Sequence, residues 1–272
     1  MKKKKIVTLS KPKPVLDIQK MRLSFSAVQS YLRCGQQYKF SYIEEKKAIP
    51  GIALLEGSSH HTAFEMNNRN KMEHSTDLKA NELTDKFMST LREKVGKEEK
   101  VDWEDENEDN LFRRARVWHE NYINDVAPKI NPDIIEEKYE MDMEMGGIEF
   151  KMVGIVDLGY SKRVSDYKTT SSYGFTNKKK EVNTDLQLSY YSLMTKRKNV
   201  EYICMVKKAT PEIGILQSTR SEGQIKWALQ VAKSVAQAIK NNDFPMTNPN
   251  NWHCSEKYCG YWKLCRGKYE RN

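Results

Sequence analysis

The sequence predicts a mixed α/β fold with an N-terminal helical elaboration, and three patterns lead to that conclusion. Apolar residues recur at helical spacing through most of the chain before Pro132. After Pro132 the spacing becomes that of β-strands joined by tight turns, with Gly146-Gly147 as a hairpin signal. Helical spacing returns in residues 184–198 and 221–241. Because a sheet and its helices bury their apolar faces against each other, we expect a mixed sheet flanked by helices.

Four helices are expected in the N-terminal elaboration. The first begins in the stretch LSFSAVQSYLRCGQQYKF, where the hydroxyl of Ser24 or Ser26 can cap the helix by accepting a hydrogen bond from a first-turn amide. The other three are expected at residues 53–70, 76–95 and 108–126. The acidic stretch VDWEDENEDN is expected to form the loop before the last of them.

Five strands are expected after this elaboration, three before the helix at residues 184–198 and two after it. They are IIEEKYEMDMEM, IEFKMVGIVDLGY, RVSDYKTT, EYICMVKK and EIGILQST. The segment after Pro245 and Pro249 carries no regular spacing and is expected to be irregular. We expect this last segment to fold back onto the helical elaboration.

The composition is that of a basic chain without a membrane span. Its 272 residues carry a formal net charge of +9, which favours a polyanionic partner such as nucleic acid. No segment approaches the roughly 20 apolar residues of a spanning helix, and the basic start lacks the apolar core of a signal peptide. We therefore expect a cytoplasmic protein with no membrane partner, with residues 1–20 as a flexible basic tail and residues 21–272 as one domain.

Two carboxylates and a lysine are expected to meet in the hairpin GIVDLGYSKRVSDYKTT. If the chain reverses at Ser161-Lys162, Asp157 and Asp166 lie opposite each other on one face, with Cβ atoms about 5 Å apart. Lys168 shares that face because side chains alternate along a strand. Opposed carboxylates repel each other, and a bound Mg²⁺ or Mn²⁺ ion would remove the repulsion. The alternative is that Asp166 and Lys168 are surface residues and that Asp157 caps a turn.

Two helical segments supply further polar residues at four-residue spacing, which places them on one helix face. In EGSSHHTAFEMNN, Gly57, His61 and Glu65 are spaced in this way, and His61 and Glu65 offer an imidazole and a carboxylate to a metal ion. In DLQLSYYSLM, Gln187 can orient a water or bond a phosphate, and Tyr191 can stack on a base. Each segment also fits an ordinary helix, with surface histidines in the first and a buried apolar face in the second.

Three of the five cysteines, Cys254, Cys259 and Cys265, lie close together near the C-terminus. Thiols stay reduced in the cytosol, so clustered cysteines there are more typical of metal sites than of disulfides. Cys204 lies in the apolar strand EYICMV and is expected to be a core residue. Three thiolates leave a four-coordinate metal site one ligand short.

Four short motifs follow one another along the chain, and none is specific by itself. They are G-x-x-x-H-x-x-x-E (Gly57 to Glu65), G-x-x-D (Gly154 to Asp157), D-x-K (Asp166 to Lys168) and Q-x-x-x-Y (Gln187 to Tyr191). In this order they resemble the PD-(D/E)XK nuclease superfamily, and most closely its RecB-like exonuclease branch, which includes CRISPR-associated and phage exonucleases. The resemblance runs from about Ser24 to Arg266.

This resemblance implies a restriction-endonuclease-like mixed sheet flanked by helices, with the helical elaboration at about 24–130 and the catalytic core at about 131–241. Iron–sulfur members of the branch join an early cysteine to three near the C-terminus. By this resemblance Cys34 is the fourth ligand, and a 4Fe–4S cluster clips the segment 250–267 to the first helix. Zn²⁺ would accept the same four thiolates. The first gap of the trio, Cys254 to Cys259, is longer than the spacing common in the branch.

The resemblance also implies the chemistry. His61, Asp157, Asp166 and the backbone carbonyl of Tyr167 would hold Mg²⁺ or Mn²⁺, with Glu65 as a further contact, and Lys168 would act on the attacking water. Gln187 and Tyr191 would complete the catalytic site. The expected reaction is hydrolysis of phosphodiester bonds in DNA with a free end or a single strand, which is exonuclease action. The run Lys178, Lys179 and Lys180, together with Tyr191, is expected to engage the DNA.

The expected setting is DNA recombination or repair, with a phage or mobile element as the source of the gene. One alternative function is a non-catalytic DNA-binding module, which would bind DNA without metal-dependent cleavage. Another is a nuclease subunit in CRISPR adaptation that depends on a partner. The chain lacks a P-loop for ATP, so any helicase motor would belong to a partner protein. A recombinase or an integrase is the other kind of partner expected.

Overall fold

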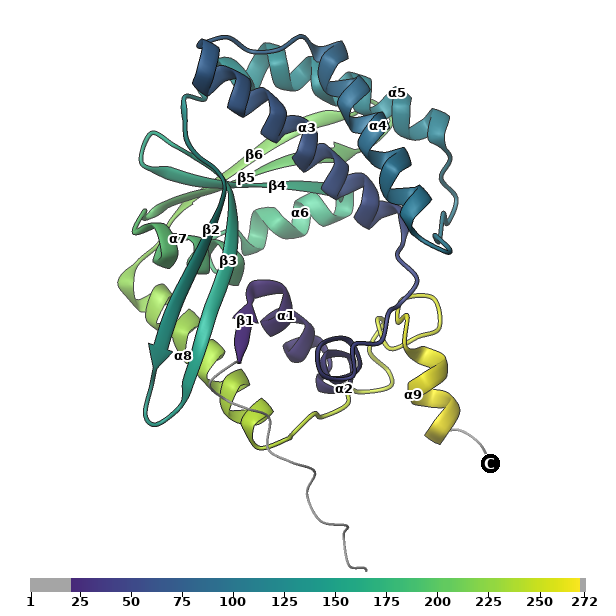
Figure 1. The fold of residues 1–272 in the computed structure, drawn as a ribbon, viewed down its shortest axis with the longest axis vertical. Coiled ribbons are helices and arrows are strands. Elements are labelled where there is room, and N and C mark those ends of the chain that lie inside the picture. Colours follow the sequence, from purple (N-terminus) through teal and green to yellow (C-terminus); the bar gives the residue numbers. More distant parts are fainter. Residues whose placement is uncertain (1–20, 270–272) are drawn as a thin grey trace, which may run out of the picture.

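A computed structural model describes residues 21–269 of the chain, with side chains as far as Arg266. The expected tail at residues 1–20 lies outside the described residues. In the described part, six strands form one mixed sheet with helices against it, which confirms the predicted fold class (Figure 1). No helix in this part is both long and apolar enough to cross a bilayer.

The strands follow the predicted order, with one short strand added at the start. They are β1 (Arg22–Ser24), β2 (Pro132–Glu144), β3 (Glu149–Tyr160), β4 (Arg163–Ser171), β5 (Asn199–Lys207) and β6 (Glu212–Thr219). The sheet runs in the order β1-β3-β4-β5-β6, and β2 also pairs with β3. The β1–β3 and β4–β5 pairs are parallel and the other pairs are antiparallel. The predicted Gly146-Gly147 turn joins β2 to β3, and both glycines have positive φ.

One edge of β3 is shared by two strands, and this leaves an opening in the sheet. β1 pairs with residues 151–153 of β3, and β4 pairs with residues 158–160. β2 occupies the other edge of β3. Residues 154–157 therefore have no strand partner on the edge that faces β4 in the described sheet. These four residues are the predicted G-x-x-D motif, which therefore borders the opening.

The β3–β4 hairpin has the predicted register. Ser161 and Lys162 form its two-residue turn, and their φ values of 47° and 61° are those of a type I′ turn, which suits the twist of a hairpin. The ladder ends with the pair Leu158 and Ser165. Asp157 and Asp166 are the next residues on the two strands, so they lie where the strands part.

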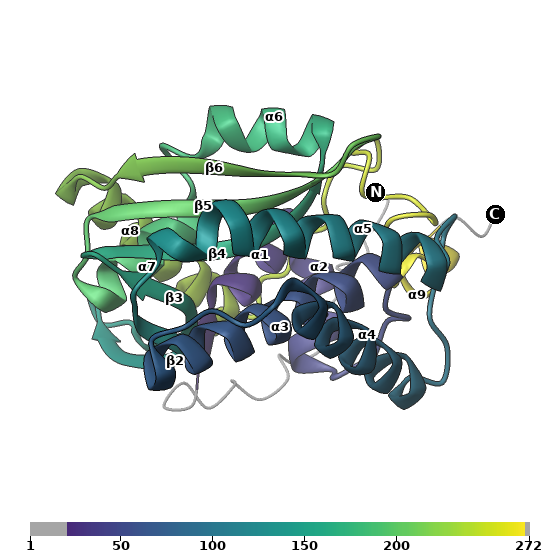
Figure 2. The same ribbon diagram turned by 90° about the horizontal axis from the view of Figure 1, so that it is seen from above.

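The helices cover both faces of the sheet. They are α1 (Phe25–Arg33), α2 (Gly35–Tyr38), the π-helix η2 (Lys39–Ile43), α3 (Ile52–His74), α4 (Ala80–Lys97), α5 (Glu108–Asn121), the π-helix η3 (Tyr122–Val126), the 3₁₀-helix η4 (Ala127–Lys129), α6 (Ser172–Glu181), α7 (Leu186–Thr195), α8 (Glu222–Lys240) and α9 (Trp262–Tyr269). Figures 1 and 2 show α3, α4 and α5 on one side and α6, α7 and α8 on the other. Trp118 of α5 and Phe64 of α3 are fully buried in the first layer. Tyr190 of α7 and Val235 of α8 are buried in the second.

Four elements differ from the prediction, each for a local reason. β1 is only three residues long, too short to show alternation. α6 has no fully buried residue, and a lysine interrupts the apolar face by which helices are recognised. The segment expected to be irregular ends in α9, which begins after Gly260 and Tyr261. The helix expected to continue to residue 198 ends at Thr195, because Lys196 adopts the left-handed conformation (φ 58°).

Candidate active site and cysteine cluster

Asp157 and Asp166 lie at the opening between β3 and β4, and both are buried, with 6% and 1% of their surface exposed. Asp157 Oδ2 accepts a hydrogen bond of 3.1 Å from the backbone N–H of Tyr167. Burial raises the pKa of Asp157 well above its usual range, and the charge of Asp166 raises it further. Because both carboxylates are buried, they need positive charge beside them to stay ionised.

Lys168 supplies one positive charge. Its Nζ lies 2.6 Å from Asp166 Oδ2. Burial works against the charged form of Lys168, but the charges of Asp166 and Asp157 outweigh burial and raise the pKa of the ammonium. Lys168 is therefore protonated at neutral pH. In this state it can orient a water or stabilise developing negative charge, but it cannot remove a proton.

The other oxygen of Asp166 is held by α7. Gln187 Nε2 donates to Asp166 Oδ1 at 2.6 Å, and the Tyr191 hydroxyl donates to the same oxygen at 3.3 Å. Gln187 also donates to the Tyr191 hydroxyl at 3.0 Å. The four-residue spacing seen in the sequence thus brings both side chains onto one carboxylate oxygen. They hold Asp166 in a fixed orientation.

The start of α7 is itself held in place by a buried arginine. The side chain of Asp185 caps the helix by accepting from the N–H of Leu188 at 3.0 Å. Arg220, which is 1% exposed, donates to the backbone carbonyls of Val182 at 2.8 Å and Asp185 at 3.1 Å. A charged donor on these carbonyls fixes the loop before α7 and hence the position of Gln187.

His61 reaches Asp157 from α3, on the other side of the opening. Its Nε2 lies 2.9 Å from the Tyr167 carbonyl oxygen, where only a protonated nitrogen can donate. Its Nδ1 lies 3.2 Å from Asp157 Oδ2 and 3.9 Å from Glu136 Oε1. Burial lowers the pKa of His61, so the ring is neutral and Nδ1 directs a lone pair at these oxygens. Facing lone pairs repel each other, and a bound cation would make the contact favourable.

Glu136 of β2 completes this group. Within the described residues, His61, Glu136 and Asp157 are three candidate metal ligands whose ligand atoms all lie within 4.8 Å of one another. One nitrogen and two carboxylate oxygens form a donor set that suits Mn²⁺ and also accepts Mg²⁺. Burial raises the pKa of Glu136 to about 7, and the nearby charge of Glu65 adds to the rise.

Glu136 was not predicted from the sequence, although a signal for it exists. The residues on either side of Glu136 pair with the residues on either side of Asp157 in the β2–β3 ladder. Counting outward from the Gly146-Gly147 turn would therefore have placed the two carboxylates opposite each other. The backbone of Glu136 has φ 45°, so the strand is distorted where the two meet.

The remaining predicted ligands lie at or beside this group. The Tyr167 carbonyl accepts the hydrogen bond from His61 and so faces the opening. Glu65 lies one turn beyond His61 on α3, where its carboxylate accepts from Arg69 Nε at 2.8 Å. Glu65 is not part of the three-ligand group.

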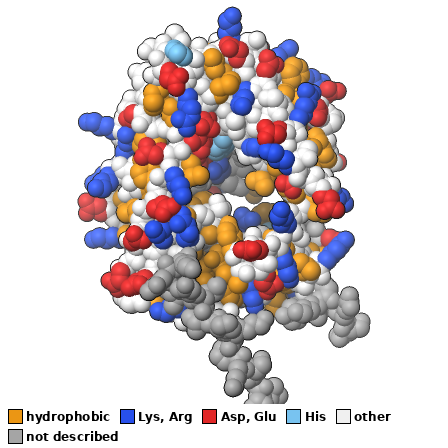
Figure 3. Space-filling model, viewed as in Figure 1, with side chains coloured by type: hydrophobic (Ala, Val, Ile, Leu, Met, Phe, Trp, Pro, Cys, Tyr) orange, Lys and Arg blue, Asp and Glu red, His pale blue; other side chains and the backbone are white. Residues whose placement is uncertain are grey.

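A cavity of about 370 Å³ opens beside the carboxylates. Asp157, Gln187 and Tyr191 line it on the side of the sheet, and Phe25 and Arg22 line it beside the start of α1. Figure 3 shows that this face of the molecule is hollowed near its centre, with histidine and basic side chains at the rim of the hollow. Asp157 and Glu136 thus border a space that is open to a ligand.

The predicted lysine run lies on α6. Lys178 is half-buried, and its Nζ lies 4.5 Å from the centre of the Tyr202 ring. Lys179 and Lys180 are exposed. The three lysines therefore differ in their relation to the site, although the sequence alone treats them alike.

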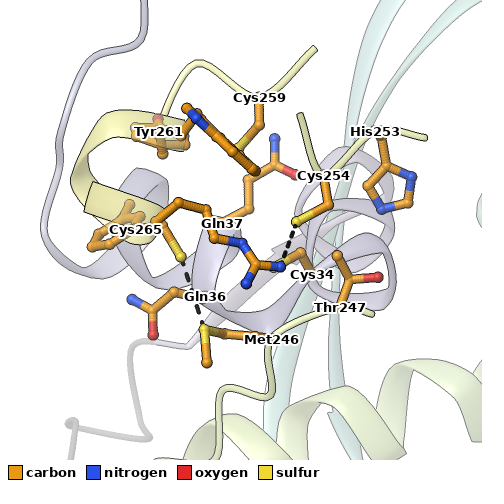
Figure 4. Close-up of a pocket in the computed structure, with 13 residues that line it drawn as sticks. Cys34, Gln36, Gln37, Met246, Thr247, His253, Cys254, Cys259, Tyr261 and Cys265 are labelled. Atoms are coloured by element: carbon orange, nitrogen blue, oxygen red, sulfur yellow. Dashed lines mark hydrogen bonds between the residues drawn. The ribbon is translucent and has the colours of Figure 1, made fainter. Parts of the chain in front are cut away.

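The four predicted cysteines are brought together by the fold. Cys34, Cys254, Cys259 and Cys265 line one cavity, and Figure 4 shows the three C-terminal cysteines grouped around the helices that carry Cys34. Cys34 lies at the break between α1 and α2, where its extended backbone (φ −165°) interrupts the helix. The C-terminal segment therefore packs on the helical elaboration, as expected.

Two close approaches hold that segment against the elaboration. A side chain at Gly35 would collide with the backbone of Phe244 and Pro245, so the absence of a Cβ lets the chain pass directly beside Cys34. Further on, the Tyr261 hydroxyl donates to the Lys46 carbonyl at 2.8 Å.

The cysteines are not equivalent in their surroundings. Burial raises the pKa of Cys259 and Cys265, and the neighbouring cysteines add to the rise. Grouped thiolates therefore need positive charge, which a metal would supply. Arg266 donates to Cys254 Sγ at 3.3 Å, so one of the sulfurs already accepts from a cation. Cys204 is fully buried in an apolar cluster of the sheet and does not line this cavity. Burial raises its pKa to about 12.

Comparisons with known proteins identify the family to which the chain belongs. The sequence model of the PD-(D/E)XK nuclease superfamily matches residues 22–266. Among solved structures, a protein from Eubacterium rectale with a proposed exonuclease assignment shares the fold, with a TM-score of 0.54, 13% identity and 88% of each chain covered. The protein SSO0001 aligns with a TM-score of 0.38 and 12% identity over 88% of this chain and 94% of its own. A search of the curated proteins gives no match. The chain belongs to the PD-(D/E)XK nuclease superfamily.

Proposed function

We propose that this protein is a metal-dependent deoxyribonuclease of the RecB-like branch that hydrolyses phosphodiester bonds from a free DNA end. Membership of the nuclease superfamily makes nucleic acid the substrate. The choice of DNA and of exonuclease action is our own inference, supported by the order of the four sequence motifs. Lys178, Lys179 and Lys180 would contribute to backbone binding through charge.

The observation that carries the proposal is the convergence of His61 Nδ1, Glu136 and Asp157 on one point, with Asp166 and Lys168 beside it. His61, Glu136 and Asp157 would hold Mg²⁺ or Mn²⁺, with Asp166 as the further carboxylate ligand that the D-x-K motif implies. The ion would activate a water and stabilise charge on the phosphoryl oxygens. The Tyr167 carbonyl, which faces the same opening, is a further oxygen available to the ion.

The chain's own residues divide the remaining work. Asp166 is oriented by Gln187 and Tyr191 and keeps the Lys168 ammonium at the opening. Because Lys168 is cationic, it positions the attacking water or stabilises the phosphoryl oxygens, and it is not the base. Because Gln187, Tyr191 and Lys168 together hold both oxygens of Asp166, this arrangement is fixed before substrate binds.

The test is cleavage of linear DNA labelled at the 5′ or the 3′ end, with Mn²⁺, Mg²⁺ or EDTA, compared with a covalently closed circle. We expect metal-dependent loss of mononucleotides from one end of the linear DNA and no cleavage of the circle. Lys168→Met is the matched inactive variant. Metal-independent cleavage, or equal cleavage by Lys168→Met, would contradict the proposal. DNA binding by wild type without cleavage would favour the non-catalytic module or a partner-dependent subunit.

We also propose that Cys34, Cys254, Cys259 and Cys265 hold a 4Fe–4S cluster with a structural role. Zn–S bonds of about 2.3 Å would require sulfurs roughly 4 Å apart in a tetrahedral zinc site. A zinc site of this kind is the alternative. We prefer the cluster because iron–sulfur members of the branch that this sequence resembles join an early cysteine to three near the C-terminus. Iron, sulfide and zinc content per chain after anaerobic purification distinguishes the two.

The setting that we propose is cytoplasmic DNA recombination or repair, with the gene carried by a phage or mobile element. A helicase, recombinase or integrase partner would supply single-stranded or end-containing DNA. CRISPR adaptation is the alternative setting. Activity of the isolated protein on linear DNA would contradict strict dependence on a partner.

A further inference from the structure

α6 places one lysine on its sheet-facing side. Phe175, Lys178 and Val182 are spaced three and four residues apart, so they lie along one face of the helix. The ring of Phe175 packs directly over Gly214 of β6, where a larger side chain would collide with it. Val182, at the end of the helix, is 6% exposed. Lys178 therefore occupies the middle of a docking stripe, where an apolar residue would be expected.

The ammonium groups of Lys178 and Lys168 approach the same aromatic ring. Their Nζ atoms lie 4.5 Å and 5.8 Å from the centre of the Tyr202 ring. Tyr202 is the registered partner of Asp166 in the β4–β5 ladder, so this ring lies beside the catalytic carboxylate. Burial raises the pKa of Tyr202, so the ring stays neutral and its face attracts a cation.

The two lysines differ in what compensates their charge. Lys168 is paired with Asp166 at 2.6 Å. Lys178 forms no ion pair with any carboxylate in the part of the chain that the structure describes. A half-buried ammonium without a carboxylate partner is unfavourable, and a contact with an aromatic ring offsets only part of that cost. An anion bound at this point would satisfy Lys178 fully.

We infer that Lys178 is a phosphate-binding residue of the active site, which holds a non-bridging oxygen of one particular backbone phosphate of the substrate strand. The inference rests on the proposed nuclease function and deepens it. Lysine is a compact donor suited to a single phosphate oxygen. Lys179 and Lys180 lie off the stripe, are exposed, and act on the DNA only through long-range charge that salt screens.

The test is a cycle that combines a protein change with a DNA change. Binding of linear DNA is measured for wild type, Lys178→Ala and Lys179→Ala. The buffer contains Ca²⁺, and the absence of cleavage is checked. Each binds unmodified DNA and a series in which one phosphate at a time, near the reactive end, is replaced by an uncharged methylphosphonate. A contact between Lys178 and one phosphate couples the two changes.

We expect Lys178→Ala to weaken binding of unmodified DNA about tenfold or more, because a hydrogen bond to a charged group is lost. The slope of the logarithm of the binding constant against the logarithm of the salt concentration should fall in magnitude by about one, which corresponds to one lost phosphate contact. At one position the methylphosphonate should weaken binding by wild type and by Lys179→Ala but not by Lys178→Ala. Equal penalties for all three proteins at every position would overturn the inference.

A second variant separates charge from packing. Lys178→Met keeps an unbranched stem against Tyr202 and removes only the ammonium. We expect Lys178→Met to reproduce the binding defect and the loss of coupling. Wild-type binding by Lys178→Met would assign the residue a packing role and overturn the inference. If wild type cleaves DNA with Mn²⁺ and no coupling is found, this inference alone fails. If wild type neither binds nor cleaves DNA, the proposed function fails with it.

Discussion

His61 Nδ1 lies 3.2 Å from Asp157 Oδ2, while Nε2 of the same ring donates to the Tyr167 carbonyl. The histidine therefore directs its lone pair at a carboxylate oxygen, and the fold holds two electron-rich atoms in contact. This arrangement predicts that a divalent cation stabilises the folded protein. Mn²⁺ at a hundredfold excess over its Kd should add about 2.7 kcal/mol to the free energy of unfolding. Thermal unfolding with Mn²⁺ and with EDTA measures the shift.

The Asp157→Asn variant sharpens this prediction. Removing the charge relieves the contact with His61 and the repulsion from Asp166, so the metal-free variant should be at least as stable as wild type. Its unfolding temperature should no longer respond to Mn²⁺. A stabilisation by Mn²⁺ equal to that of wild type would place the ion elsewhere.

Glu136 is expected to be a metal ligand, because its carboxylate completes the three-ligand group. Glu136→Gln should weaken Mn²⁺ binding by roughly 10- to 100-fold, measured by calorimetry. The matched control is Glu137→Gln, since Glu137 is the next residue of β2 and is exposed. Equal affinities in the two variants would remove Glu136 from the site.

Lys168 is expected to affect the rate and not the metal. Because its ammonium is paired with Asp166 and kept protonated, Lys168→Met should reduce kcat by about 10²–10³-fold. The Mn²⁺-dependent shift in unfolding temperature should persist, since the three ligands remain. Loss of that shift would indicate that Lys168 is needed to keep the ligands in place.

The buried histidines of the helical layer should make the protein sensitive to acid. His119 is fully buried, its Nε2 lies 3.1 Å from His60 Nδ1, and burial lowers its pKa from 6.5 to about 3. Below pH 6.5 His119 binds a proton in the unfolded chain but stays neutral in the folded chain. The contribution of neutral His119 is therefore present above pH 6.5 and is lost progressively as the pH falls towards 3.

His119→Asn should flatten the dependence of the unfolding free energy on pH in this window, by up to about 1.4 kcal/mol per pH unit. The control is His74→Asn, because His74 is exposed at the end of α3. Denaturant unfolding at a series of pH values gives both slopes. An unchanged slope in His119→Asn would show that other groups cause the acid sensitivity.

The cysteine cluster predicts a selective loss of metal. Cys34→Ser should lower the iron and sulfide content of the purified protein and expose the C-terminal segment to protease, because the segment is held at Cys34 and Gly35. Cys204→Ser introduces a hydroxyl into the core and should lower stability while leaving the iron content intact. The same iron content in both variants would exclude Cys34 as a ligand.

Much of the site could be predicted because it depends on local rules. The spacing of Asp166 and Lys168 places them on one face of a strand, and the turn at Ser161-Lys162 sets the register with Asp157. The four-residue spacing of Gln187 and Tyr191 likewise brings both onto Asp166. Glu136 was not predicted, although the register of the preceding β2–β3 hairpin places it opposite Asp157.

The sequence by itself determined the order of helices and strands, the β3–β4 register and the residue types of the site, because periodicity and turn chemistry act over a few neighbouring residues. The tertiary structure alone decided that β1 and β4 share one edge of β3 and leave residues 154–157 open. It also decided that Lys178, of three adjacent lysines, faces Tyr202. The shared edge of β3 and the position of Lys178 both depend on how elements distant in the sequence pack together. Local sequence patterns do not determine the free energy of that packing.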